Sequence, residues 1–476
     1  MKTLTMKFGG TSVGSPEAIG NVIAIVQAEL QRDQRVMVVV SAFAGVTDLL
    51  YETVREAVAG NKWNYLSASQ KLRERHLEAL TILTTTGPIR DEAQAAIEKL
   101  ADQHAQLCQA VTILGDVTPR ITDAIVTFGE RWSSIIVAAA LQHAGVNATA
   151  YDSGQFIRTD DRHGSATPIW GETETLIRDQ LLPLLDQGVT PVLTGFMGMT
   201  ADGHHTTLGR GGSDYSAAIY AAFTESDELV IWTDVDGVMT TDPRIDQRAR
   251  VLPNVSYQEV GELAFYGAKV LHPKTVQPIL VKNIPMRVRN TFNPQHPGTL
   301  IGPQNIPTAT VIKAVTSVRH VSLLTVSGRG MLGVPGIAGR TFLATADVGA
   351  NILMISQASS EQHFCFVVMN NKALEAREAI EAALVDEIER EDVDCVEVMP
   401  EVAIVTAVGA GMRGTPGVAG RIFTQMGEAG VNVIAIAQGA SEVSVSFVIA
   451  EADIDQAVTA LHDLALESIA AVNGSG

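Results

Sequence analysis

Short apolar runs alternate with longer helical patterns up to about residue 290. Residues 36–40 are all apolar, which is typical of a strand buried on both faces of a parallel sheet. Comparable runs predict further strands at 4–8, 146–151, 189–196, 228–232 and 284–289. Helical patterns occupy 135–141, 176–185 and 215–223. A longer helical pattern covers 49–114, and we interpret this region as two or three scaffold or lid helices that carry no chemistry. The alternation predicts an α/β fold with a largely parallel central sheet.

The last third of the chain contains an internal repeat. Residues 333–340, Gly-Val-Pro-Gly-Ile-Ala-Gly-Arg, recur at 414–421 as Gly-Thr-Pro-Gly-Val-Ala-Gly-Arg, an offset of 81 residues. The same offset aligns two pairs of polar residues, Asn351 with Asn432 and Gln357 with Gln438. A duplicated module is the simplest explanation. The pattern of each copy is strand, Gly-Pro loop, helix, strand, strand, helix and strand, which is a ferredoxin-like βαββαβ order.

Each copy offers groups that suit a free amino acid as a ligand. The Gly-Pro loop ends at a helix N-terminus, and the Asn and Gln side chains can form hydrogen bonds with an amine and a carboxylate. Buried glutamines can also simply satisfy the ends of strands. The polar stretch 293–307, rich in proline and glycine, predicts a linker before the repeat.

Composition narrows the classes of function. A chain of 476 residues is long enough for roughly two to four domains. Its formal net charge of −19 argues against general nucleic-acid binding and against an anionic membrane surface. The three cysteines, Cys108, Cys365 and Cys395, are too far apart to indicate a disulfide framework or a zinc site. The N-terminus has no apolar signal core and no apolar run approaches roughly 20 residues, so we expect a cytoplasmic protein.

The most informative stretch is 206–214, Thr-Thr-Leu-Gly-Arg-Gly-Gly-Ser-Asp. Glycines on both sides of Arg210 let backbone amides approach a ligand, and a guanidinium can bind a carboxylate or phosphate through two parallel hydrogen bonds. We expect Ser213 to cap the helix at 215–223, whose N-terminus favours anions. In the alternative interpretation the stretch is a glycine-rich turn with a solvated Arg210, and Asp214 merely offsets the helix dipole.

A second glycine loop follows the strand predicted at 4–8. Residues 9–12, Gly-Gly-Thr-Ser, lead to a helix start with Ser15 at the cap and Pro16 in the first turn. Strand, glycine loop and helix form an arrangement that binds phosphate, and the ammonium of Lys7 could reach phosphate oxygens. The loop matches neither the P-loop pattern nor the dinucleotide-binding fingerprint.

Polar groups also follow other predicted strands. Ser41 and Thr47 come after the strand at 36–40, at the edge where open α/β sheets bind ligands. Glu130 follows a glycine and introduces an apolar helix, although a single glutamate in this place is more often a first-turn helix charge.

The strand predicted at 228–232 is followed by two polar motifs. They are Thr-Asp-Val-Asp-Gly at 233–237 and Thr-Asp-Pro-Arg at 241–244. Considered without the rest of the chain, the two motifs could equally form two successive turns. Lys269 closes a helical pattern and returns to the same sheet edge.

Taken together, these motifs resemble those of the aspartate kinases, which belong to the amino-acid kinase family and carry two ACT regulatory modules. The carriers of the resemblance are 7–12, 41–47, 128–130, 208–214, 232–238, 241–244 and 267–273. The resemblance covers essentially the whole chain. It implies an αβα catalytic domain at 1–305, a first ACT domain at 306–395 and a second at 396–476, with the strand near 308–318 as a candidate member of the second.

The resemblance implies ATP-dependent phosphorylation of the β-carboxylate of L-aspartate to 4-phospho-L-aspartate, the first step of lysine, threonine and methionine biosynthesis. It assigns Arg210 to the α-carboxylate of aspartate and Glu130 to its ammonium. Lys7 would stabilise the transferring phosphoryl group, and Asp214 would organise that lysine. Further implied roles are aspartate binding by Ser41, Thr47 and Ser213, and nucleotide binding by Lys7, Gly9, Gly10, Thr233, Asp234, Arg244 and Lys269.

One position departs from the pattern of the resembled family. Met239 stands where the family commonly carries a tyrosine beside the nucleotide base. A methionine can still pack against adenine, so the departure bears on nucleotide affinity or selectivity more than on the chemistry.

The residue inventory suits this reaction independently. A carboxylate with a pKa of ~4 is ionised at neutral pH, so the nucleophile needs no general base. The site has to align two anions, which is the positioning and electrostatic work of phosphoryl transfer. We expect Mg²⁺ to be held mainly by ATP phosphates, so no protein metal site is predicted.

The paired ACT modules imply inhibition by an amino-acid end product, bound near Asn351, Gln357, Asn432 and Gln438. The two glutamines resemble the threonine-responsive kinases linked to homoserine dehydrogenase more than the lysine-responsive ones, so threonine is the favoured effector. Because ACT modules commonly pair between subunits, the resemblance also implies a homodimer or homotetramer.

Three alternatives remain open at this point. A related kinase for glutamate, N-acetylglutamate or a nucleoside monophosphate is disfavoured by the Phe-Gly-Glu setting of Glu130 and by the paired ACT copies. A non-catalytic amino-acid sensor is disfavoured because every charged residue of the motifs is retained. The chain could also be the front portion of a bifunctional protein with a dehydrogenase.

Overall fold

The first apolar runs form neighbouring strands, β1 (Lys2–Phe8) and β2 (Gln34–Val40), which pair in parallel. The computed structural model describes residues 2–32, 34–267, 273–303, 311–331, 334–357 and 362–473. The chain divides into two compact units. The first comprises Met1–Val238, Val251–Tyr257 and Val270–Gln304, and the second comprises Met239–Arg250, Gln258–Lys269 and Asn305–Gly476.

The first unit is built on an eight-stranded sheet with the order β3-β4-β2-β1-β7-β9-β10-β8. Its remaining strands are β3 (Ala148–Tyr151), β4 (Thr190–Thr194), β7 (Glu228–Thr233), β8 (Asn254–Ser256), β9 (Met286–Asn290) and β10 (Thr299–Gly302). The described pairings are parallel except that of β9 with β10. The predicted α/β fold with a largely parallel sheet is confirmed.

The linker expected at 293–307 is wrong in part, because β10 lies within it. Thr299 and Ile301 are buried, and Thr299 Oγ1 donates a hydrogen bond to Leu252 O at 2.6 Å. The four residues of β10 carry too short an alternation to be recognised between prolines and glycines. Pairing with β9 and with β8, which is more distant in sequence, decides their structure.

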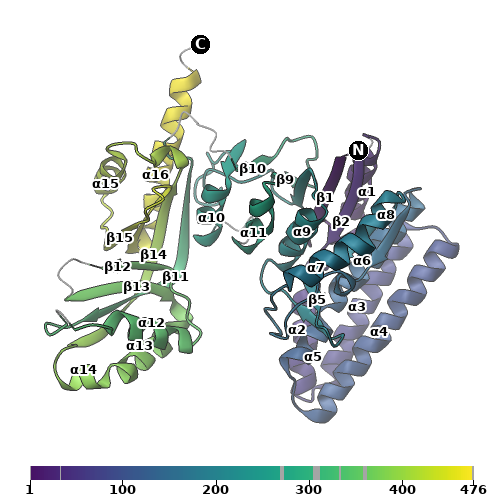
Figure 1. Cartoon of the computed structure of the whole chain (residues 1–476), viewed down its shortest axis with the longest axis horizontal. Helices are drawn as coiled ribbons and strands as arrows, with labels where there is room; N and C mark the ends of the chain where they lie inside the picture. Colours follow the sequence, from purple (N-terminus) through teal and green to yellow (C-terminus); the bar gives the residue numbers. More distant parts are fainter. Residues whose placement is uncertain are drawn as a thin grey trace. The chain divides into compact units, whose positions relative to one another are not determined.

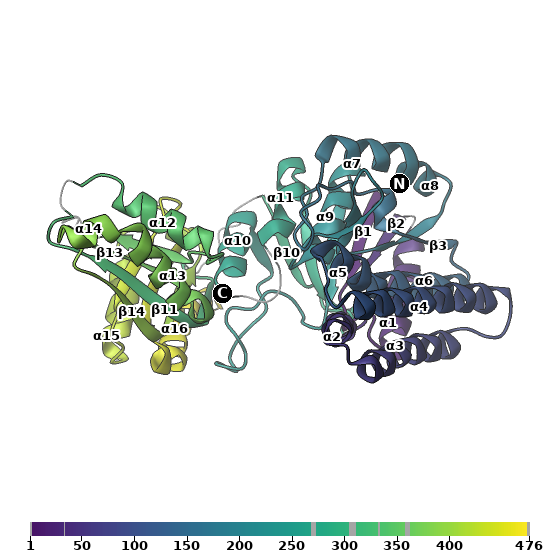
Figure 2. The same ribbon diagram turned by 90° about the horizontal axis from the view of Figure 1, so that it is seen from below.

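Helices cover both faces of this sheet. Figure 2 shows α7, α9 and α11 on one side of β1 and β2, with α1, α4 and α6 on the other. The helices are α1 (Pro16–Leu30), α2 (Val46–Val58), α3 (Lys62–Leu83), α4 (Pro88–Leu114), α5 (Pro119–Val126), α6 (Phe128–His143), α7 (Trp170–Leu176), a π-helical turn (Ile177–Leu181), α8 (Leu182–Asp186), α9 (Gly212–Phe223) and α11 (Pro273–Lys282). A short hairpin of β5 (Met197–Met199) and β6 (His205–Thr207) precedes α9. The region 49–114 forms helices, as predicted.

Two predicted helix caps have different outcomes. Ser15 caps α1, because its Oγ accepts a hydrogen bond from Ala18 N at 3.2 Å. Ser213 does not cap α9, since that helix begins at Gly212 and its N-cap is Gly211. The φ angle of Gly211 is 72°, a left-handed conformation that glycine adopts without steric cost. Ser213 therefore lies inside the first turn of α9.

The stretch Pro119–His143, which contains α5 and α6, is long and apolar enough to cross a membrane, but 83% of its most apolar window is buried in the structure. Trp132, Ile136 and Leu141 of α6 belong to the hydrophobic core beneath β1 and β2. This stretch is therefore a core element of the first unit.

The second unit contains a six-stranded antiparallel sheet with the order β12-β13-β11-β14-β16-β15. Its strands are β11 (Ala314–Ser327), β12 (Met354–Gln357), β13 (His363–Met369), β14 (Cys395–Val408), β15 (Ala435–Gln438) and β16 (Ser444–Ala450). Its helices are α10 (Tyr257–Phe265), α12 (Ile337–Asp347), α13 (Asn370–Ala383), α14 (Val385–Glu389), α15 (Val418–Glu428) and α16 (Ile454–Asn473).

The two repeat copies share their longest strands. Figure 1 shows β11 and β14 side by side along the second unit. The start of β11, from Ala314 to Val318, pairs with the end of β14 beside β16, whereas its later half pairs with β13. The sequential βαββαβ order expected of the second copy is therefore wrong at its last element, which the first half of β11 supplies. This pairing agrees with the candidate membership of the strand near 308–318 in the second copy.

Two segments from the middle of the chain pack within the second unit. Glu259 of α10 forms a buried ion pair with Lys313 at 3.0 Å and accepts a hydrogen bond from Ala410 N at 2.7 Å. Asp246 Oδ2 lies 2.8 Å from Nδ1 of the buried His462 in α16. These contacts join residues 239–250 and α10 to the repeated modules. The domain limits expected at 305 and 395 stay a prediction.

Candidate active site

A hollow of about 380 Å³ lies at the carboxyl ends of β1 and β2. It is lined by the end of β1 with its glycine loop, the loop after β2, the start of α6 and the stretch that leads into α9. Its lining residues include Lys7, Gly10, Ser41, Thr47, Glu130, Arg210, Ser213 and Asp214. The structure thus gathers eight of the residues that the sequence analysis selected.

Lys7 and Asp214 form an ion pair in this hollow. Lys7 lies one residue before the end of β1, and its Nζ is 2.5 Å from Oδ1 of Asp214 in the first turn of α9. The two side chains are only 11% and 14% exposed, so water screens their charges weakly. A Cβ added to Gly9 would lie 3.7 Å from Lys7 Nζ, which places the ammonium beside the glycine loop.

The glycine loop and the loop after β2 touch through their backbones. Ala44 N donates to Gly10 O at 3.0 Å, and a Cβ on Gly10 would lie 3.0 Å from Ala42 O. Such close approach leaves little room for a side chain at Gly10. The two loops therefore form one wall of the hollow.

Arg75 of α3 reaches both loops. Its guanidinium donates to Ala44 O at 2.9 Å and to Gly14 O at 3.1 Å. The sequence analysis missed this contact because it interpreted 49–114 as scaffold or lid helices without chemistry. Arg75 stands among other charged residues of an ordinary surface helix, so no sequence pattern distinguishes it.

Glu130 is a buried carboxyl group with one unsatisfied oxygen. Its side chain lies in the first turn of α6, where the residue is 3% exposed, and Oε1 accepts a hydrogen bond from Ala42 N at 3.1 Å. No partner for Oε2 is found among the described residues. Burial raises the pKa of Glu130 to about 8, although the Ala42 amide and the positive charge of Lys7 act in the opposite direction. Glu130 Oε2 is therefore a candidate contact for a hydrogen-bonding or cationic group of a ligand.

Arg210 lies in the short loop between β6 and α9. Gly209 and Gly211 on either side of it have φ angles of 79° and 72°. Arg210 is exposed and lines the hollow, so its guanidinium is open to an anionic ligand. The glycine-rich turn of the alternative interpretation is present, but the turn faces the hollow.

Two of the residues predicted to bind the nucleotide, Lys7 and Gly10, line this hollow, whereas Thr233, Asp234 and Arg244 do not. Thr233 ends β7 and Asp234 follows it in the first unit, where Thr233 Oγ1 donates to Asp234 Oδ1 at 3.2 Å. Arg244 belongs to the second unit and pairs with Asp242 at 2.5 Å. Lys269 lies outside the described residues. The nucleotide site therefore stays a prediction.

The residues predicted to bind an effector occupy equivalent places in the second unit. Gln357 ends β12 and Gln438 ends β15, and both are exposed, as are Asn351 and Asn432. Ser356 Oγ donates to Ile436 O at 2.9 Å, so the two edge strands lie side by side. An effector near one copy would therefore lie close to the other.

Known proteins share this organisation. A model of the amino acid kinase family matches residues 2–290, and a model of the ACT domain matches 324–384 and 405–464. The chloroplastic aspartokinase 1 of Arabidopsis thaliana is 32% identical over 475 residues, which cover 98% of this chain and 80% of that protein. The chain belongs to the aspartokinases of the amino acid kinase family. The resemblance seen in the sequence is thereby confirmed.

Other relatives extend the comparison. The structure of E. coli aspartokinase III in complex with aspartate and ADP (R-state) matches with a TM-score of 0.81 at 30% identity, covering 98% of this chain and 100% of that chain. The bifunctional aspartokinase/homoserine dehydrogenase 1 of A. thaliana, also chloroplastic, is 36% identical over 465 residues, which are 96% of this chain and 50% of that protein. The chain thus spans about half the length of the first curated relatives it matches.

Proposed function

We propose that the chain transfers the γ-phosphoryl group of ATP to the β-carboxylate of L-aspartate, giving 4-phospho-L-aspartate and ADP. The observation that carries the proposal is the single hollow lined by an ammonium, a guanidinium and a buried carboxyl group. An amino acid with an acidic side chain has the complementary set: an α-carboxylate, an α-ammonium and a second carboxylate. The solved relatives in complex with aspartate support the same substrate.

The site residues divide the work in this proposal. Arg210 binds the α-carboxylate and Glu130 the α-ammonium, while Ser41, Thr47 and Ser213 hold and orient the substrate. Lys7 stabilises the phosphoryl group during transfer, and Asp214 positions Lys7. The β-carboxylate is already ionised at neutral pH, so no residue has to remove a proton from it. Catalysis is then mainly alignment of two anions and stabilisation of their charge.

The nucleotide part of the proposal rests on the resemblance. Amides of Gly9 and Gly10 approach the phosphates together with Lys7, and Thr233, Asp234, Arg244 and Lys269 complete the nucleotide site. Within the described part of the chain, no group of three or more His, Cys, Asp and Glu side chains is arranged to hold a metal ion. As expected of the family, Mg²⁺ would be held mainly by the ATP phosphates, where it would supply neutralising charge.

A coupled assay for aspartyl phosphate tests this function. We expect product with aspartate and ATP, and none with glutamate, N-acetylglutamate or nucleoside monophosphates. Isothermal titration with aspartate, run beside the assay, separates a kinase from a sensor. Aspartate binding without ATP turnover would favour the sensor, and turnover of another acceptor would overturn the substrate assignment.

Arg210→Lys is expected to raise the KM for aspartate about tenfold with a small change in kcat. Lysine keeps the charge but cannot form two parallel hydrogen bonds to a carboxylate. Steady-state kinetics with aspartate varied at saturating ATP measure the effect. Arg162→Lys, at an exposed arginine that binds Asp160 at 2.8 Å, is the matched control. An unchanged KM in Arg210→Lys would remove Arg210 from the aspartate site.

The ACT modules make the enzyme sensitive to an amino-acid end product in this proposal, and threonine is the effector we favour over lysine. Support comes from the exposed glutamines in equivalent places of the two copies and from relatives that are joined to homoserine dehydrogenase. Lysine is the alternative effector, because one solved relative is in complex with lysine and aspartate.

Gln357→Ala and Gln438→Ala are each expected to raise the threonine concentration for half-inhibition by about tenfold or more. A hydrogen bond to a charged group contributes roughly 1.5–3 kcal/mol, so its loss weakens binding by this factor or beyond. Inhibition curves with threonine and lysine measured separately give the result. Gln456→Ala, at an exposed glutamine of α16, serves as the control. A wild type that responds to lysine and ignores threonine would reverse the preference.

Assembly and location complete the proposal. We favour a homodimer or homotetramer formed through the ACT modules, which light scattering at several concentrations would identify. The cytoplasmic location expected from the sequence stays a prediction, since the relatives include chloroplastic and bacterial proteins.

A further inference from the structure

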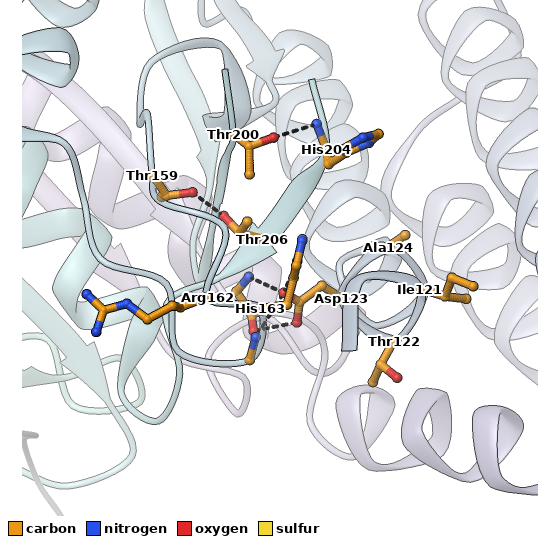
Figure 3. A network of polar contacts seen from close by, with 12 residues as sticks. Ile121, Thr122, Asp123, Ala124, Thr159, Arg162, His163, Thr200, His204 and Thr206 are labelled. Atoms are coloured by element: carbon orange, nitrogen blue, oxygen red, sulfur yellow. Dashed lines mark hydrogen bonds and ion pairs between the residues drawn. The ribbon is translucent and has the colours of Figure 1, made fainter. Parts of the chain in front are cut away.

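Asp123 is a buried carboxylate without a role in the proposed chemistry. It lies in α5 with 1% of its surface exposed. Its Oδ2 is 2.9 Å from His163 Nδ1 and accepts hydrogen bonds from Gly164 N at 3.0 Å and Thr207 N at 3.1 Å. Its Oδ1 accepts from Thr207 Oγ1 at 2.8 Å. Figure 3 shows Asp123 and His163 within this network of polar contacts.

The contacts join three separate segments of the first unit. They are helix α5, the loop at 160–166 and the end of strand β6. Gly164 N, Thr207 N and Thr207 Oγ1 donate to Asp123, and His163 Nδ1 lies within hydrogen-bond distance of it. Asp123 therefore connects its helix to two other segments of the first unit.

The stretch that carries Arg210 begins directly after Thr207. A Cβ added to Gly209 would lie 3.3 Å from Gly164 O, so this stretch packs against the same loop that Asp123 holds. Two glycines flank Arg210, and glycine backbone loses more conformational entropy on ordering than any other residue. The direction of Arg210 therefore depends on how firmly the chain is held at Thr207.

We propose that Asp123 is a positioning residue for aspartate binding, which holds Thr207 and thereby aims Arg210 at the α-carboxylate of the substrate. The inference rests on the proposed function and deepens it. Asp123 does not line the hollow, so it acts through the Arg210 stretch rather than on the substrate. A merely structural carboxylate would affect folding and both substrates alike, whereas a positioning carboxylate affects aspartate selectively.

Three substitutions separate the contacts. Asp123→Ala removes all four acceptor contacts. Asp123→Asn keeps an oxygen for the three contacts of Oδ2, and its amide can donate to Thr207 Oγ1 with the direction of that bond reversed. Thr207→Val removes the hydroxyl contact and preserves the shape of the side chain. We expect Asp123→Ala to raise the KM for aspartate most and Thr207→Val to raise it less. Asp123→Asn should keep a KM close to that of the wild type.

The experiment measures the KM values for aspartate and ATP, kcat and the melting temperature of the full chain. We expect Asp123→Ala to raise the KM for aspartate about tenfold, while the KM for ATP changes less than about twofold. Asp160→Ala is the matched control, because Asp160 accepts backbone hydrogen bonds from Arg162 and Thr167 in the same loop without a contact to β6. It should leave both KM values unchanged.

A double-mutant cycle with Arg210→Lys supplies a second readout. If Asp123 acts through Arg210, Asp123→Ala should add little to the KM for aspartate of Arg210→Lys, so the two effects are not additive. Additive effects, equal increases in both KM values, or an unchanged KM for aspartate would each overturn the inference. If Asp123→Ala does not fold, the same criteria apply to Thr207→Val, while Asp123→Asn is still expected to keep a KM for aspartate close to that of the wild type. A wild type without aspartyl phosphate formation would instead refute the proposed function, and the inference with it.

Discussion

Replacing Lys7 by alanine is expected to lower kcat by about 10² or more, as the loss of one group that stabilises transition-state charge does in other enzymes. Lys7 is the cation beside the glycine loop, and its charge is weakly screened because only 11% of its side chain is exposed. Phosphoryl transfer between two anions has to proceed without this charge in the variant. The coupled aspartyl phosphate assay at saturating aspartate and ATP measures the effect.

Two controls make this result specific. Lys2→Ala removes an exposed lysine from the start of the same strand and should leave kcat unchanged. Lys7→Ala also leaves the carboxylate of Asp214 without its ion-pair partner. Lys7→Ala combined with Asp214→Asn removes this unpaired charge and should remain as slow as the single variant. A folded Lys7→Ala protein with near-normal kcat would refute the assigned role.

Glu130→Gln is expected to raise the KM for aspartate by about 10- to 100-fold, since a hydrogen bond between charged partners contributes roughly 1.5–3 kcal/mol. In the free protein the Glu130 carboxyl has a pKa raised to about 8 by burial, so it is mostly protonated at pH 7. The ammonium of aspartate stabilises the ionised form, and binding therefore releases a proton.

The proton release gives a pH dependence with a definite sign. The apparent KM of the wild type for aspartate should fall as pH rises toward about 8 and level off above it, and Glu130→Gln should lose this dependence. Isothermal titration at pH 7 in buffers with different ionisation enthalpies should show release of about one proton by the wild type and none by the variant. Equal proton release by both would exclude Glu130 as the group that titrates.

The same substitution should make the protein more stable at high pH. A carboxyl group whose folded pKa is raised from 4.5 to about 8 contributes stability below 4.5, and that contribution is lost as pH rises through 8. Glu130→Gln removes the cost of ionising a buried group, so its melting temperature should exceed that of the wild type at pH 8 more than at pH 5. Glu52→Gln, at an exposed glutamate of α2, should show no such difference.

The sequence was a good guide wherever a local pattern determined the structure. The strand at 36–40 was predictable because five consecutive apolar residues have to be buried, and Ser15 was predictable because its side chain caps the helix that follows it. Ser213 misled the prediction, because a preceding glycine in a left-handed conformation began the helix instead. Strand β10 escaped notice, since its pairing with β9 and with the more distant β8 decides its structure. The strand near 308–318 was a candidate for the second copy, but only the sheet showed that the same strand continues into the first copy.

The amino-acid sequence by itself determined the chemical inventory of this protein: which strands are buried, where glycines permit tight loops, which charged side chains follow those strands, and that the last third is a duplicated module. Only the tertiary structure decided which of these groups meet. It brought Lys7, Glu130, Arg210 and Asp214 to one hollow, and it connected Arg75 and Asp123 to the surrounding loops. The physical reason is that periodicity and capping act over a few neighbouring residues, whereas a hydrogen bond such as that of Asp123 with Thr207 joins segments that only the packed sheet and helices place side by side.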